Sequence, residues 1–238
     1  MSYKTTNPAL SEKTFRDFTP STTHMTLEGT ATKAAGLLAM TFAAAAASWV
    51  FGISLGICMI SVLVAFVVAL VVIFNPRSAP YLSPVYAVLE GVALGGVSAI
   101  YEANYPGIVT NAVGLTFGVF ATMLFLYRTR MIQATENFKL GVVSATGAVA
   151  LLYIVDLGLM FFGIRVPFIH EGGFWGIAFS LFVVGLAALN LVMDFDFIET
   201  GVERQAPKYM EWYSAFGLLV TLVWLYLELL RLLSKMKK

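Results

Sequence analysis

The chain has 238 residues, of which 59% are hydrophobic and only 12% are charged, with 15 Lys and Arg against 14 Asp and Glu. Soluble domains are about 25% charged, so this chain has too few charges to cover a water-exposed surface. The net charge of +1 argues against an intrinsically disordered chain and against a nucleic-acid-binding domain, because the first needs high net charge and the second a basic surface. The composition indicates a polytopic membrane protein.

Seven apolar windows follow a polar N-terminal arm, residues 1–32, which lacks the apolar core of a secretory signal. Each window is close to the ~20 residues of a membrane-spanning helix, and none resembles the ~10 alternating residues of a membrane strand. Turn-forming pairs such as Asn75-Pro76 and Pro106-Gly107 separate most of them, and the join near Phe51-Gly52 is the least marked boundary. The windows are 34–52, 54–74, 82–103, 108–127, 140–162, 174–193 and 212–233. We expect an all-α integral membrane protein with one seven-helix domain at 33–234 and a basic tail at 235–238.

Lys and Arg residues are concentrated on one side of the expected membrane, which is the cytoplasmic side in most membrane proteins. The opposite side has only Arg165 in its connections. The enriched side carries Lys4, Lys13, Arg16, Lys33, Arg77, Arg128, Arg130, Lys139, Arg204 and Lys208. This bias predicts a cytoplasmic N-terminus.

The C-terminal end conflicts with that bias, because a seventh crossing would export four cations. These are Arg231, Lys235, Lys237 and Lys238. Either the last window crosses, since charges late in the chain orient a protein weakly, or it enters the membrane and returns. We favour a crossing, because residues 212–233 are continuously apolar apart from Glu228 and Arg231.

Glycines spaced four residues apart recur in the windows, and such pairs let membrane helices approach closely. The pairs are Gly52/Gly56, Gly91/Gly95, Gly114/Gly118 and Gly172/Gly176. They predict helix packing.

Four acids lie in or at the end of apolar windows, where charge is costly and often functional. Glu90 lies about nine residues into the third window, or ~13 Å at ~1.5 Å per residue, and its own window holds no cation. Asp156 is nearer the outer end of the fifth window, Asp194 follows the sixth directly, and Glu228 is in the seventh. These acids are the candidate functional residues.

Each acid also has a plain structural interpretation, which for Glu90 would require a partner from another helix. Glu228 is three residues before Arg231 and can pair with it on one helix face. Asp194 is either a site residue or part of a solvated acidic loop, and we expect Asp196 to lie in such a loop. Asp156 is expected in the outer headgroup region.

Nothing in the chain predicts enzyme activity, a cofactor or a fixed metal site. The only histidines are His24 in the arm and His170 in an outer loop, and Cys58 is the only cysteine. Phosphate-binding loops, zinc-protease motifs and nucleophile elbows are absent. Paired intramembrane acids leave an aspartyl protease formally open, although no protease signature surrounds them.

At its acids the chain resembles the Bax inhibitor-1 family, also called the transmembrane BAX inhibitor motif family, and looks like a bacterial member. The segments that carry the resemblance are LEGVALGG at 89–96, Asp194-x-x-x-Ile198 and LYLELL at 225–230. The resemblance extends from Asn7-Pro8 through the last window. It implies six helices around a central seventh, in the bacterial cytoplasmic (inner) membrane, and a pH-sensitive calcium leak.

By position, the resemblance makes Asp194 and Glu228 the pair that shares a proton and gates the pore, and Glu90 the acid of the third helix on the ion path. Two features depart from the family: Glu228 stands where Asp is usual, and the segment between the two acids is longer than usual. Two carboxylates at one site cannot easily both ionise, so such a pair titrates as a unit. Deprotonation would separate the helices or free oxygens for a transient Ca²⁺, and would open the leak as pH rises.

Two other functions are consistent with the sequence. Some bacterial relatives are associated with membrane-protein quality control, so the chain is alternatively a non-conducting protein that binds a membrane protease or another partner through residues 1–32. A secondary transporter is less favoured, since no inverted repeat is visible.

Overall fold

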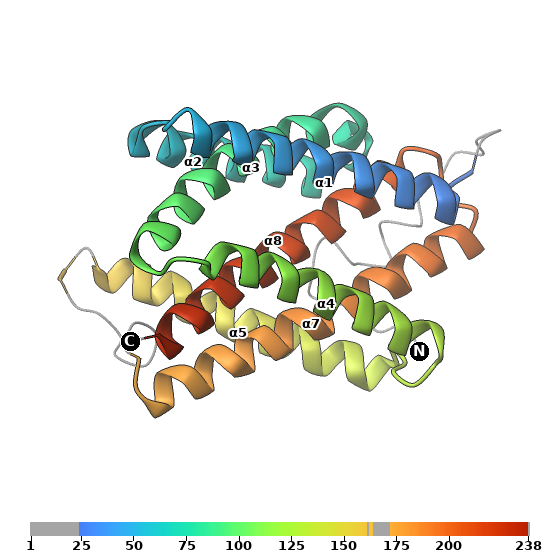
Figure 1. Ribbon diagram of the computed structural model, residues 1–238. Coiled ribbons are helices and arrows are strands. Elements are labelled where there is room, and N and C mark those ends of the chain that lie inside the picture. The colour runs from blue at the N-terminus through green and yellow to red at the C-terminus, as the bar shows by residue number, and fades with distance from the viewer. Residues whose placement is uncertain (1–23, 161, 164–171, 238) are drawn as a thin grey trace. The chain divides into compact units, whose positions relative to one another are not determined.

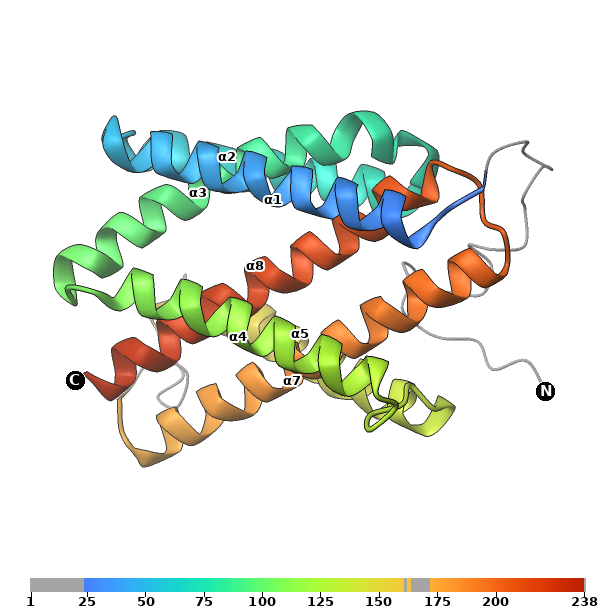
Figure 2. The same cartoon turned by 45° about the vertical axis from the view of Figure 1, so that its right-hand side comes forward.

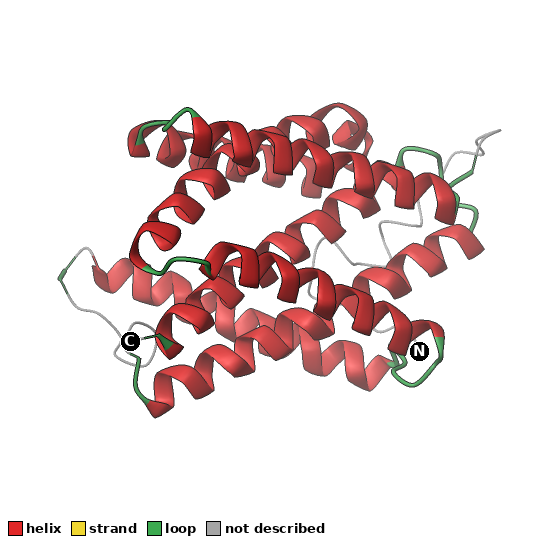
Figure 3. Ribbon diagram, viewed as in Figure 1, coloured by secondary structure: helices red, strands yellow, loops and turns green. Residues whose placement is uncertain are grey.

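The computed structural model describes residues 24–160, 162–163 and 172–237; most of the N-terminal arm, Arg165, His170 and Lys238 lie outside this part of the chain. Seven helices in the described residues are long and apolar enough to cross a membrane (Figures 1 and 3). They are α1 (Leu27–Val50), α2 (Leu55–Phe74), α3 (Ala79–Asn104), α4 (Ile108–Arg128), α5 (Glu136–Met160), α7 (Phe174–Glu203) and α8 (Met210–Met236). The prediction of an all-α, seven-helix membrane protein is confirmed.

The first helix begins at Leu27, inside the segment that the sequence assigns to the arm. Thr26 caps it, because its backbone is extended and its side chain accepts a hydrogen bond from the amide of Gly29 at 3.0 Å. The helix ends at Val50, where Gly52 has a φ of +58°. Such a left-handed conformation favours glycine and terminates helices, so the expected break near Phe51-Gly52 is present.

The chain forms two compact units. One comprises Met1–Ala103 and Asp196–Val220, and the other comprises Asn104–Phe195 and Thr221–Lys238. The first unit contains α1, α2 and α3, and the second contains α4 and α5. Both α7 and α8 contribute residues to each unit.

In the first unit, α3 packs directly on the backbone of α1, and α1, α2 and α3 lie side by side in both views (Figures 1 and 2). A Cβ atom added at Gly91 would lie 2.5 Å from the carbonyl oxygen of Thr41, and one at Gly95 would lie 2.4 Å from that of Ala45. These distances leave no space for a side chain, so the Gly91/Gly95 pair forms the close contact that its spacing predicts.

The other glycines do not all behave in this way. A Cβ atom at Gly96 would lie 2.5 Å from Sγ of Cys58 on α2, which extends the close contact of α3 to a second helix. Four predicted packing positions meet no heavy atom within 4 Å among the described residues: Gly52, Gly56, Gly114 and Gly118. Of the Gly52/Gly56, Gly91/Gly95 and Gly114/Gly118 pairs, only the pair on α3 therefore forms a close helix contact.

In the second unit, the C-terminal end of α8 lies beside the N-terminal end of α7. Lys235, only 3% exposed, donates from Nζ to the carbonyl oxygen of Gly176 and to Oγ of Ser180, both at 2.9 Å. The two helices therefore run antiparallel here, as a seventh crossing requires. Lys235, which the sequence assigns to a basic tail, belongs to α8 because carbonyl and hydroxyl oxygens of α7 accept its hydrogen bonds. Of the seven helices, α8 has the largest buried share, 67% of its most apolar window.

Candidate functional site

Glu228 is bound within the second unit. Its side chain is 2% exposed and accepts hydrogen bonds from Nη1 of Arg231 at 2.9 and 3.0 Å and from the hydroxyl of Tyr153 on α5 at 3.0 Å. The same Arg231 atom also donates to the Tyr153 hydroxyl. The pairing of Glu228 with Arg231 that their spacing allows is therefore present, with Tyr153 as a third member.

Asp194 is bound less completely. Its carboxyl group on α7 has a hydrogen bond with the Thr221 side chain on α8. One oxygen of this carboxyl group, Oδ2, is buried and has no hydrogen-bond partner among the described residues. Leaving a buried acceptor unsatisfied costs about 1–3 kcal/mol, so Asp194 is the most unusual of the candidate residues.

The structure does not bring Asp194 and Glu228 into contact. Among the described residues, Asp194 bonds to Thr221, which precedes Glu228 by seven positions on α8, or ~10 Å at ~1.5 Å per residue. The Glu228 carboxylate instead accepts hydrogen bonds from Arg231 and Tyr153. The shared-proton pair of Asp194 and Glu228, which the family resemblance implies, thus remains a prediction. In the structure each acid has its own hydrogen-bond partners.

Glu90 lies in the first unit, on α3. Its carboxylate is hydrogen-bonded to the side chain of Tyr86, one turn earlier on the same helix. The Tyr86 ring packs edge-on against Phe216 of α8, with 5.0 Å between ring centroids. In the part of the chain that the structure describes, Glu90 has no ion pair. Its partner is a hydroxyl of its own helix instead of a cation from another helix.

The structure corrects the expectation for Asp196, and the expectation for Asp156 stays a prediction. Asp156 is only 5% exposed in α5, but burial within the protein does not decide its depth in the membrane. Asp196 does not lie in a loop, because α7 continues through it to Glu203. The helix continues because no proline interrupts the chain before Pro207, and acidic side chains are compatible with helix.

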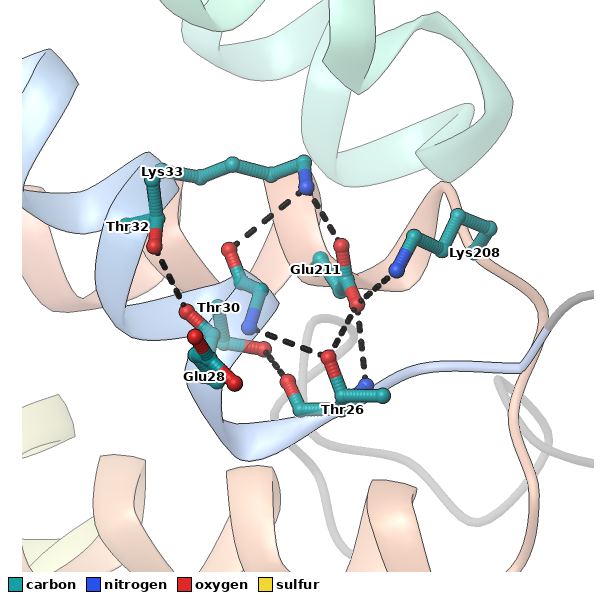
Figure 4. A network of polar contacts seen from close by, with 8 residues as sticks. Thr26, Glu28, Thr30, Thr32, Lys33, Lys208 and Glu211 are labelled. Carbon is teal, nitrogen blue, oxygen red and sulfur yellow. Dashed lines mark hydrogen bonds and ion pairs between the residues drawn. The ribbon is translucent and has the colours of Figure 1, made fainter.

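Another buried acid, Glu211 at the start of α8, is absent from the sequence-based candidates. It is fully buried and binds three segments of the first unit (Figure 4). It accepts hydrogen bonds from the backbone amide and hydroxyl of Thr26, both at 2.9 Å, from Nζ of Lys208 at 2.8 Å and from Nζ of Lys33. The sequence contains one signal for this cluster, the Lys208/Glu211 spacing of three residues, but nothing local points to Thr26 or Lys33.

The Glu211 cluster (Thr26, Lys33, Lys208 and Glu211) requires a glycine on α1. A Cβ atom at Gly29 would lie 2.2 Å from Oε1 of Glu211. Any larger residue would displace the carboxylate from its donors. The Glu211 carboxylate can reach its donors because Gly29 has no side chain.

No three His, Cys, Asp or Glu side chains of the described residues gather as metal ligands. The partners found for Glu90, Asp194, Glu211 and Glu228 are Arg, Lys, Thr or Tyr side chains. Such carboxylates can exchange a proton or bind a cation transiently, but three ligands for a resident ion are not assembled in these segments.

The fold and these acids define a class: seven-helix membrane proteins with acids buried within their helices. Within that class the chain belongs to the Bax inhibitor 1 like family, which matches residues 7–238. No curated protein matches the chain.

Proposed function

We propose that this protein is a non-enzymatic, pH-sensitive leak for calcium or another cation in a bacterial inner membrane. In this proposal Asp194 and Glu228 control the gate and Glu90 lies on the ion path. The observation that carries it is the buried Oδ2 of Asp194, which has no hydrogen-bond partner among the described residues of a membrane-spanning helix. Membership of the Bax inhibitor 1 like family supports it.

Asp194 is the group that we assign to proton or cation binding. A carboxylate oxygen without a donor is costly in a membrane helix, and a proton or a cation would relieve that cost. Carboxylate and hydroxyl oxygens are ligands that Ca²⁺ accepts, and the Thr221 side chain bonds to the same carboxyl group.

Glu228 supplies the second part of the gate. We assign its pairing with Arg231 and Tyr153 to the closed state, because the carboxylate is then neutralised and unavailable to a cation. When Asp194 loses its proton, an unpaired negative charge appears on α7 in the second unit. Such a buried charge is costly in a membrane helix, and entry of a cation or water that relieves this cost would favour the open state as pH rises.

The test is calcium flux into dye-loaded vesicles that contain the purified protein, followed after jumps between about pH 6 and pH 8. Wild type is expected to leak faster at the higher pH, and Asp194→Asn and Glu228→Gln to lose most of this dependence. The matched control is Glu136→Gln, which changes an acid with 69% side-chain exposure at the start of α5. An unchanged pH response in both Asp194→Asn and Glu228→Gln would refute the proposed gate.

The same vesicles distinguish the alternative function. Deleting residues 1–23 removes most of the arm but leaves α1, which begins at Leu27. A leak is expected to keep its flux after this deletion. A non-conducting protein that binds a membrane protease or another partner through the arm would show no flux before or after it.

A further inference from the structure

The backbone just before α1 pairs with the turn between α7 and α8. His24 and Pro207 form an antiparallel bridge. The amide of Met25 donates to the carbonyl oxygen of Ala206 at 2.7 Å, and Nδ1 of His24 lies 3.0 Å from the carbonyl oxygen of Gln205. Residues 24–26, which we call the N-terminal strap, thus bind a connection more than 170 residues away in the sequence.

The Glu211 cluster anchors this strap. Thr26, its last residue, gives both its backbone amide and its hydroxyl to Glu211, and Lys33 and Lys208 hold the same carboxylate from α1 and from the turn (Figure 4). A fully buried carboxylate that lost these donors would remain as an uncompensated buried charge. The strap is therefore fixed at one end by a contact that is costly to break.

The turn bound by the strap joins the two helices that carry the proposed gate. It extends from residue 204 to residue 209, between the end of α7 and the start of α8. Gln205 within it has a φ of +51°, a left-handed conformation that few side chains adopt. A short, conformationally restricted connection of this kind is where a change in the relation of two helices must be absorbed.

We infer that the N-terminal strap is a built-in restraint on the leak: bound to the α7–α8 turn it holds the gate closed, and released it lets the gate open. This inference rests on the proposed function, since it assigns a regulator to the same gate. It predicts that changes at Glu211 and Gly29, neither of which is among the proposed gate acids, alter the flux.

A reversible cross-link tests the restraint in the otherwise intact chain. His24→Cys and Pro207→Cys, placed in a Cys58→Ala background, would put two thiols on bridged residues. Antiparallel partners have Cα atoms about 4.5–5.5 Å apart, within the range of disulfides. Oxidation is expected to lower the flux below that of the reduced protein, and reduction to restore it. Equal flux in both states would refute the restraint.

Two glycine substitutions on α1 give a matched comparison without changing any charge. Gly29→Ala would displace the Glu211 carboxylate, whereas Gly36→Ala meets nothing within 4 Å among the described residues. We expect Gly29→Ala to raise the flux about 5- to 150-fold, the usual range for coupling between two sites, and Gly36→Ala to leave it unchanged. Wild-type flux from correctly folded Gly29→Ala would contradict the inference.

The rate of cross-linking separates this inference from the proposed function. Thiols at 24 and 207 are expected to join more slowly when Glu211→Gln or the milder Lys208→Met is added, because the strap is then less often bound. Unchanged rates in both would overturn the anchoring role of Glu211 whatever the flux. If the wild-type vesicles show no flux at all, the proposed function fails and the strap keeps only this structural role.

Discussion

At the scale of single residues, Glu211 shows how a buried carboxylate is stabilised where a span begins. Two lysines and Thr26 surround it, and the side chain is fully buried, whereas the Lys208 side chain is 49% exposed. We expect Glu211→Gln to lower the free energy of unfolding by about 1–3 kcal/mol, because it removes charge-assisted hydrogen bonds from both lysines and from Thr26. Lys208→Met is expected to cost less than about 1 kcal/mol, since an exposed ion pair contributes little. Thermal unfolding in detergent micelles would compare the two, and equal losses would contradict this ranking.

Arg231 presents the opposite case, a cation that neutralises a buried acid from its own helix. Arg231→Met would leave Glu228 with only the Tyr153 hydroxyl, and we expect a loss of about 3–5 kcal/mol. Tyr153→Phe removes one hydrogen bond to each partner and is expected to cost about 1–3 kcal/mol. Unfolding of both variants and of the double variant would measure the coupling. Independent, additive losses would show that the three side chains do not act as a unit.

At the scale of helices, the glycine-rich face of α3 determines how closely α1 can approach. We expect Gly91→Ala and Gly95→Ala each to cost about 1–3 kcal/mol, because each new methyl group would collide with a backbone carbonyl of α1. Gly114→Ala and Gly118→Ala are the matched controls on α4. They meet nothing within 4 Å in the described residues and are expected to be neutral or to stabilise, because alanine favours helix by about 1 kcal/mol. A loss of stability in the α4 variants would contradict this distinction.

The lengths of α1 and α7 show where hydropathy underestimates a helix. α1 begins at Leu27 because Thr26 caps it, although Glu28 and Lys33 make its first turns polar. α7 continues to Glu203, beyond the last apolar residue of its window. Apolar windows report the part of a helix that matches the membrane core, whereas capping and turn residues decide where the helix itself begins and ends.

For the molecule as a whole, three of the four C-terminal cations that conflict with a seventh crossing have partners within the second unit. Arg231 pairs with Glu228, Lys235 bonds to oxygens of α7, and Lys237 donates to the carbonyl oxygen of Pro106 at 3.1 Å. Because these contacts make the three cations part of the folded bundle, we expect α8 to cross the membrane.

A topology experiment tests this crossing. With a cytoplasmic N-terminus, a reporter that is active only in the cytoplasm is expected to be inactive when fused after Lys238. The same reporter fused after Lys208, in the connection before α8, is expected to be active and serves as the control. Strong activity at both positions would refute seven crossings, since α8 would then begin and end on the same side.

The seven spans, the all-α class, the family resemblance and the presence of acids inside the spans can all be predicted from the sequence. These follow from composition, from window length and from motifs, which are local properties of the chain. The partners of each acid, in contrast, depend on how the chain folds. Glu228 is held by Tyr153, 75 residues away, and Glu211 is held by Lys33 and Thr26, 178 and 185 residues away. Such partners depend on the packing of distant helices, which no local pattern encodes.

The glycine pairs follow the same rule. The spacing of Gly91 and Gly95 matches that of Gly114 and Gly118, yet the structure shows only the first pair in contact with a neighbouring helix.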